Sequence, residues 1–185
     1  MKRIIVCLLL CSFAVAGVAQ EKLTKLKLNK EIEVRVPASF SPMSEQEIVS
    51  RYLSNSTPIA VYGNERRTTD FGISKNATRW TMKDSEILKD FYKASILSTY
   101  NEVKFYKEEL VAYNDQVFIL FEFLSYFKEE SENAISTKSA VNKYTYIMYG
   151  IRDGNLYVFN FNAPSNDREY WQKTVGKMMK SIKLL

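Results

Sequence analysis

The stretch QVFILFEFLSYF, residues 116–127, is apolar on both faces of an extended strand. One face carries Val117, Ile119, Phe121 and Phe123, and the other carries Phe118, Leu120 and Leu124. A strand that is apolar on both faces is covered on both faces. We therefore expect it to lie inside a layered protein. Glu122 is the exception, and we expect it to be paired with a lysine or arginine or to lie at a rim of the sheet, because a buried lone charge is costly.

The residues around this stretch predict a mainly antiparallel sheet. Turn residues at Asn114-Asp115 and Asp153-Gly154 join neighbouring strands as hairpins. The polar stretch 128–143 is expected to be a loop. Alternation of apolar and polar residues predicts strands at 31–36, 59–62, 69–74, 102–113, 144–151 and 156–161.

Three helices are expected, at 44–53, 85–100 and 167–184, the first two after capping patterns at Ser44/Glu47 and Thr81/Asp84. Helices that are separated in sequence can cover opposite faces of one sheet, which gives an α+β sandwich. In the second helix the predicted sheet-facing stripe is Ile87, Leu88, Phe91, Ala94 and Leu97. In the last helix it is Trp171, Val175, Met178 and Ile182, with Arg168, Lys173, Lys177 and Lys180 facing out.

The two ends of this order resemble the Mog1/PsbP-like family of α/β/α sandwiches. The opening motif is IEVRVPASF, residues 32–40, and the closing unit is GNLYVF, residues 154–159, then Pro164 and a helix ending in MKSIKL, residues 179–184. The resemblance covers residues 31–184 and implies a scaffold that binds other proteins. It rests on packing motifs, so it carries over no functional residue. A cystatin- or NTF2-like cone is the alternative fold.

The N-terminus is typical of a secretory signal peptide. Met1-Lys2-Arg3 is followed by an apolar run to Ala16 and by the small residues Gly17 and Ala19. We expect cleavage after Ala19, leaving residues 20–30 as an arm or edge strand and residues 31–185 as one PsbP-like domain in the periplasm or outside the cell. A transmembrane anchor needs about 20 apolar residues, and a lipid anchor would use Cys7 or Cys11; both are weaker interpretations.

Composition excludes several chemistries. The 185 residues include no histidine, and both cysteines lie in the expected leader. The mature chain therefore has no Ser-His-Asp or Cys-His catalysis and no histidine- or cysteine-bound metal. No cofactor is expected. The net charge of +5 falls to +3 without Lys2 and Arg3, too weak for a nucleic-acid partner.

Tyrosines supply the candidate interaction surface. Although packing in the core explains most aromatic residues here, Tyr and Trp are also enriched in protein interfaces. The candidate surface residues are Tyr144, Tyr146, Tyr149 and Tyr157, with Arg66, Arg67 and Trp80 as a second patch.

The leading hypothesis is an exported, non-enzymatic binding or assembly module that contacts a protein or an envelope component. One alternative is a carrier of a small apolar ligand. The other is a carboxylate-only hydrolase, which needs two converging acids. Its candidate acids are Glu122 and the pairs Glu108-Glu109 and Glu129-Glu130.

Overall fold

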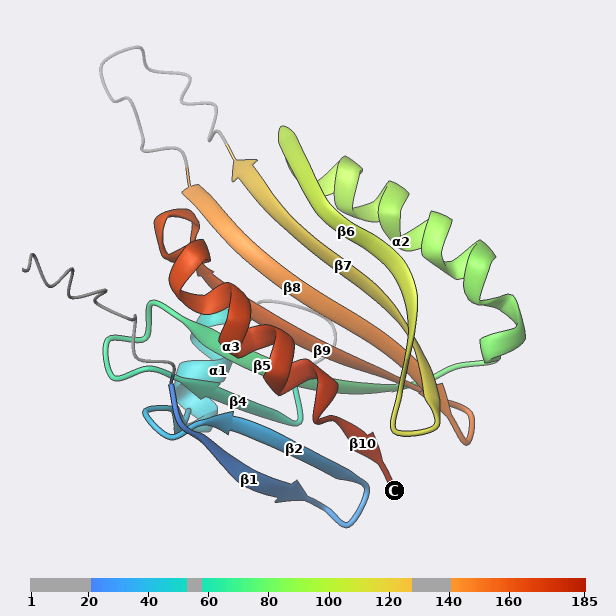
Figure 1. Cartoon of the computed structure of the whole chain (residues 1–185), viewed down its shortest axis with the longest axis horizontal. Helices are drawn as coiled ribbons and strands as arrows, with labels where there is room; N and C mark the ends of the chain where they lie inside the picture. The colour runs from blue at the N-terminus through green and yellow to red at the C-terminus, as the bar shows by residue number, and fades with distance from the viewer. Residues whose placement is uncertain (1–20, 53–57, 128–140) are drawn as a thin grey trace, which may run out of the picture.

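A seven-stranded antiparallel sheet forms the centre of the protein (Figure 1). The computed structural model describes residues 21–52, 58–127 and 141–185; the expected signal peptide and most of the predicted loop at 128–143 lie outside them. The strands, in their order across the sheet, are β3 (Ser41–Pro42), β4 (Ala60–Gly63), β5 (Asp70–Ala77), β9 (Asn155–Pro164), β8 (Val141–Arg152), β7 (Gln116–Phe127) and β6 (Glu102–Tyr113).

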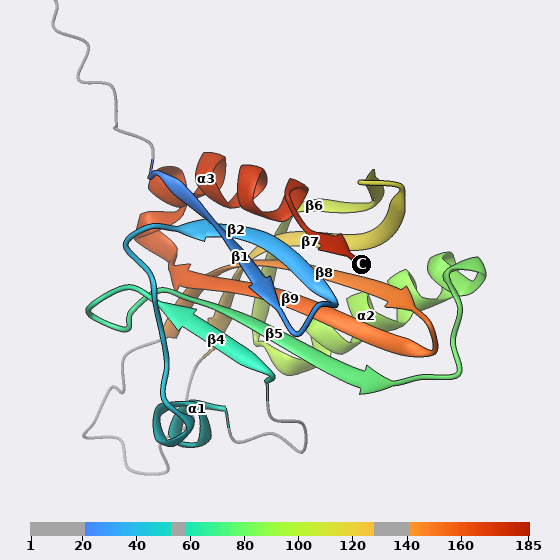
Figure 2. The same cartoon turned by 90° about the horizontal axis from the view of Figure 1, so that it is seen from below.

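Two layers cover this sheet, one on each face (Figure 2). One layer is α3 (Arg168–Lys180) with a small antiparallel sheet of β1 (Leu23–Leu28), β2 (Ile32–Pro37) and β10 (Lys183–Leu184). The other layer is α1 (Glu45–Arg51) and α2 (Ser85–Thr99), and single 3₁₀ turns at Met82–Asp84 and Ser165–Asp167 precede α2 and α3. The predicted α+β architecture, a mainly antiparallel sheet between helices, is confirmed.

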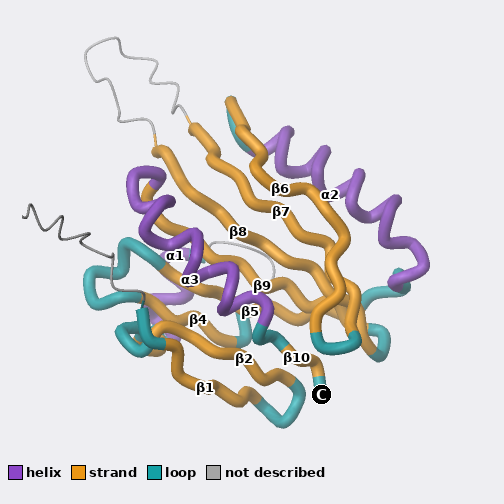
Figure 3. The backbone as a smooth tube through the Cα atoms, viewed as in Figure 1, coloured by secondary structure: helices purple, strands orange, loops and turns teal. Residues whose placement is uncertain are grey.

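The small sheet was not predicted from the sequence. Both β1 and β10 pair with β2, so the first and last described strands lie side by side with it (Figure 3). The last helix is consequently shorter than predicted. It ends at Lys180, and Ile182 is buried in the short connection to β10 rather than on the helix.

The two faces of β7 contact different cores, as its sequence predicts. Phe118 and Leu120 belong to the core between the sheet and the α3 layer. Ile119, Phe121 and Phe123 belong to the core under α2.

The capping pattern predicted at Ser44/Glu47 is confirmed, because the two residues form the capping box that begins α1. No helix among the described residues is long and apolar enough to cross a membrane.

The prediction of which side of α2 faces the sheet is wrong, because the helix is rotated about its axis relative to the expected orientation. Leu88 and Ile96 are buried, and Tyr92 stacks on Tyr149 of β8 with ring centroids 3.9 Å apart. The helix carries apolar residues on two sides, and the side with the stacking aromatic faces the sheet. Four residues of the predicted stripe are exposed instead: Ile87, Phe91, Ala94 and Leu97.

Candidate functional site

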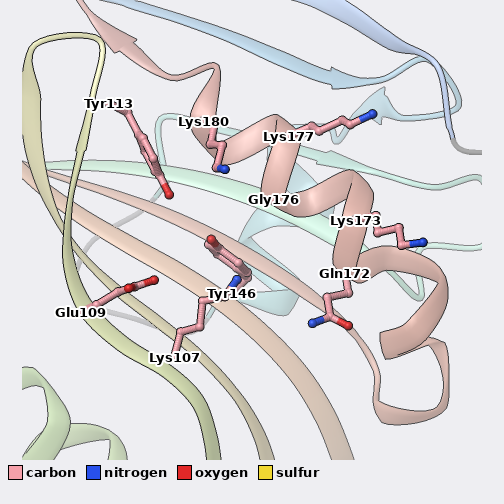
Figure 4. A pocket seen from close by; sticks show the side chains of 9 residues that line it. All are labelled: Lys107, Glu109, Tyr113, Tyr146, Gln172, Lys173, Gly176, Lys177 and Lys180. Carbon is pink, nitrogen blue, oxygen red and sulfur yellow. The ribbon is translucent and has the colours of Figure 1, made fainter.

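An open groove of about 560 Å³ lies between α3 and the edge strand β6 (Figure 4). The helix supplies one wall and the sheet supplies the floor and the other wall. Figure 4 shows the hydroxyl ends of Tyr113 and Tyr146 facing each other across the floor. The groove is lined by Lys107, Glu109, Tyr113, Tyr146, Gln172, Lys173, Gly176, Lys177 and Lys180.

A β-bulge in β6 decides which side chains enter the groove. The pairing of β6 with β7 shifts between Phe105 and Lys107, so Tyr106 is the extra residue. After the shift Lys107 lies opposite Glu122, on the α3 side of the sheet. Alternate residues of a strand share a face, so Glu109 and Tyr113 follow Lys107 into the groove.

Glu122 lies beneath one end of this groove and is fully buried, with 0% of its side chain exposed. The Nζ atom of Lys107 lies 2.8 Å from Oε2 of Glu122. The hydroxyl of Tyr144 donates to Oε1 over 3.1 Å, and Nη2 of Arg168 lies 3.9 Å from the same oxygen. The expected pairing of Glu122 with a lysine or arginine is therefore present.

Arg168 does not face solvent as predicted. Its guanidinium lies 3.6 Å from the ring centroid of Tyr106, the bulged residue, and only 20% of its side chain is exposed. A cation over an aromatic face is stabilised by the ring quadrupole. The bulge thus gives Arg168 a partner and turns it towards Glu122.

The phenols of the groove floor stay neutral. Tyr144 does not line the groove but holds Glu122, and burial, reinforced by that carboxylate, raises its pKa well above the usual value of 10. Burial also raises the pKa of Tyr146, whose hydroxyl interacts with that of Tyr113. Neutral phenols can both donate and accept hydrogen bonds, so the Tyr113–Tyr146 pair gives the floor a polar centre, and the α3 wall places the ammonium group of Lys180 beside it (Figure 4). The groove is suited to a ligand that carries negative charge.

The positive charge continues beyond the groove onto the small sheet. A second groove, of about 470 Å³, lies on the other side of α3 and shares Lys177 and Lys180 with the first. The ion pair with Lys25, at 2.8 Å, lowers the pKa of the Glu33 carboxyl, and Lys183 and Lys27 lower it further. We call the whole surface the basic face: Lys25, Lys27, Arg35, Lys173, Lys177, Lys180 and Lys183.

The four tyrosines predicted to form a wet surface are buried. Tyr144 is 0%, Tyr146 1%, Tyr157 5% and Tyr149 8% exposed. They were misassigned because both faces of the sheet are covered, so alternate positions on β8 and β9 point into one core or the other. Tyr146 alone also reaches the groove, where it forms part of the floor.

The second predicted patch is divided by the fold. Arg67 supports the hairpin between β4 and β5: it pairs with Glu47 at 2.9 Å and donates to the carbonyls of Ser41, Pro42 and Gly63. Arg66 is exposed beside it, before β5, whereas the half-exposed Trp80 follows β5. The eight residues of β5 separate Arg66 from Trp80.

Comparison with known proteins identifies the fold. No protein-family model matches the sequence, and no curated protein matches it significantly. Cyanobacterial PsbP (CyanoP) from Synechocystis sp. PCC 6803 has a similar structure, with a TM-score of 0.60 and 12% identity over 91% of this chain and 96% of that one. The Ran-binding protein Mog1p of Saccharomyces cerevisiae gives 0.53 and 13% over 89% and 96%. The chain therefore has the Mog1/PsbP-like fold.

Proposed function

We propose that the chain is an exported, non-enzymatic binding or assembly module whose partner is a protein with an acidic segment. The observation that carries this proposal is the groove between α3 and β6, which is lined by three lysines of α3 and by the neutral phenols of Tyr113 and Tyr146, with the ammonium group of Lys180 nearest to the phenols (Figure 4). Its one lining acid is Glu109. The groove leads onto the rest of the basic face, so an acidic segment could contact both.

The packing under α3 supports a binding role over the alternative of a small-ligand carrier. The space between α3 and the sheet is filled: Trp171, Val175 and Met178 are almost fully buried, and Trp171 packs on Phe161 with ring centroids 5.4 Å apart. This packing gives the carrier hypothesis no support.

Export is supported by the signal-like residues 1–19. One structural neighbour is named a Ran-binding protein, which makes protein binding a reasonable use of the scaffold, although fold alone does not imply function.

Among the described acids proposed for a hydrolase, the adjacent pair Glu108-Glu109 points to opposite faces of the sheet and Glu122 is already paired. Glu108 pairs with Lys93 of α2 at 2.7 Å, whereas the adjacent Glu109 lines the groove on the opposite face. Glu122 is held by Lys107 and Tyr144. Glu129 and Glu130 lie outside the described residues.

Partner capture from a cell-envelope extract tests this function. The bait carries a photo-crosslinking amino acid in place of Gln172, which lines the groove. We expect a crosslinked partner whose recovery falls as salt rises, because exposed charges are screened. The double variant Lys173→Glu/Lys180→Glu is expected to abolish the crosslink.

The matched control is Arg66→Glu/Arg79→Glu, which makes the same change in charge at exposed positions outside the basic face. It should leave capture intact. Loss of capture in the control alone would move the contact surface to the ends of β5. Failure to crosslink any partner, or equal crosslinking by both double variants, would contradict the assignment to the groove.

A further inference from the structure

The outer face of α2 carries an apolar stripe that no described residue covers. Ile87 is 64% exposed, Phe91 63% and Leu97 49%, and the exposed Ala94 lies between them. These residues are three or four apart, so they share one side of the helix. The opposite side of α2 already packs on the sheet through Leu88, Tyr92 and Ile96. The apolar side chains of the stripe therefore do not contribute to the packing of α2 on the sheet.

We propose that this stripe is the interface of a symmetric dimer, in which α2 packs antiparallel on α2 of a second copy of the chain. In that arrangement Ile87 of each copy meets Leu97 of the other, and Phe91 meets Ala94. A large side chain thus lies opposite a small one at the centre, which lets the two helices interdigitate. A two-fold interface needs such a self-complementary patch.

The charges beside the stripe favour the antiparallel orientation. Asp90 lies in the first half of the helix and is exposed, Glu86 is paired with Lys89 of the same helix, and the second half of the helix carries no acid. Antiparallel packing places Asp90 of each copy beside the acid-free second half of the other helix. Parallel packing would place Asp90 beside Asp90, and like charges there are destabilising.

The ends of α2 carry a complementary pair. Lys83 precedes the helix and Glu102 follows it, and both are exposed. An antiparallel pair brings Lys83 of one copy to the end where Glu102 of the other lies. Opposite charges therefore meet at both ends of the interface, as the symmetry requires.

The size of the patch sets the expected affinity. The 15 residues of α2 make a helix about 22 Å long, and one helix pair buries far less than the about 800 Å² per partner of a standard interface. The dimer should therefore be weak and depend on concentration. Because α2 and α3 lie on opposite faces of the sheet (Figure 2), the two basic faces would point away from the interface and could bind two acidic segments at once.

Sedimentation velocity of the exported chain over a wide concentration range tests the proposal. We expect a reversible monomer–dimer equilibrium, and Phe91→Glu should raise its dissociation constant by at least about tenfold. Val49→Glu is the matched control, because Val49 is 62% exposed but lies on α1; it should leave the equilibrium unchanged.

Charge reversal tests the orientation. Lys83→Glu and Glu102→Lys should each weaken the dimer, and the two variants mixed, or combined in one chain, should restore it. The near-ultraviolet circular dichroism of each variant must match that of the parent chain. A chain that stays monomeric at every concentration, a dimer indifferent to Phe91→Glu, or charge reversals that do not compensate would overturn the proposal.

Discussion

Replacing Lys107 with methionine is expected to destabilise the fold by about 2 kcal/mol. Removing one partner of a fully buried ion pair costs about 3–5 kcal/mol, because the remaining charge stays desolvated. Two features of this site reduce the cost. Lys107 is 39% exposed, so water can approach the gap, and Arg168 remains 3.9 Å from Glu122. Methionine keeps the length of the side chain, so little packing is lost.

Urea denaturation followed through the fluorescence of the buried Trp171 measures this effect. In a parallel thermal melt, about 2 kcal/mol corresponds to a fall in Tm of about 4–8 °C for a domain of this size. Lys104→Met on the same strand is the control. Its ammonium lies 5.5 Å from the Tyr106 ring centroid at an exposed position, so its loss should cost at most about 1 kcal/mol.

A double-mutant cycle with Glu122→Gln separates the ion pair from other effects. Once the carboxylate is neutral, Lys107→Met should cost at least about 1 kcal/mol less than in the parent chain. An equal cost in both backgrounds would refute the reasoning, because it would mean that Lys107 acts through packing and not through the buried charge.

Three further predictions concern packing and pH. Gly150→Ala should destabilise the fold by about 1–3 kcal/mol, because its Cβ would lie 2.6 Å from the Phe118 ring. Gly176→Ala on α3 should stabilise the fold by up to about 1 kcal/mol, because no atom outside the adjacent helix backbone lies within 4 Å of the added Cβ. Urea denaturation of the two variants checks that the changes have opposite signs. The backbone N–H of Ser44 and the side chain of Arg67 hold the pKa of Glu47 below its usual 4.5. The ionised Glu47 carboxylate therefore stabilises the folded state at neutral pH, and this stabilisation is lost as pH falls through the lowered pKa. The stability difference between the parent and Glu47→Gln should therefore shrink in acid, and a pH-independent difference would contradict this account. Burial raises the pKa of Tyr52 and Tyr146 above 10, so their stabilising effect persists up to about pH 10 and is lost above it; the tyrosinate absorbance of these residues should appear only as the chain unfolds.

The central pairing of the site was readable from the sequence. The turn at Asn114-Asp115 was predicted, and counting outward from a two-residue turn places Lys107 directly opposite Glu122, which is the pairing in the structure. The lysines of α3 were also predicted to face outward. Their meeting with β6 in one groove was not predictable, because it depends on how α3 lies across the sheet, and no local pattern encodes that.

The errors about tyrosines and α2 have a common physical cause. Apolar periodicity shows that a face can be buried, but it does not show which of two faces has a partner. On β8 and β9 both faces have one, so the tyrosines expected at the surface are buried. On α2 two apolar sides compete, and the sheet takes the side on which Tyr92 can stack on Tyr149.

The incomplete coverage of the sheet explains where the groove lies. α3 and the small sheet pack mainly on β9, β8 and β5, so the α3-side face of the edge strand β6 has no helix directly above it. Side chains there must tolerate water while still shielding the floor, and Lys107, with an apolar stem and a charged end, does both. The buried Glu122 fixes that stem in place and offsets one positive charge. Lys107 therefore closes the core at this edge and also lines, with Lys180 of the α3 wall, the groove in which binding of an acidic partner is proposed.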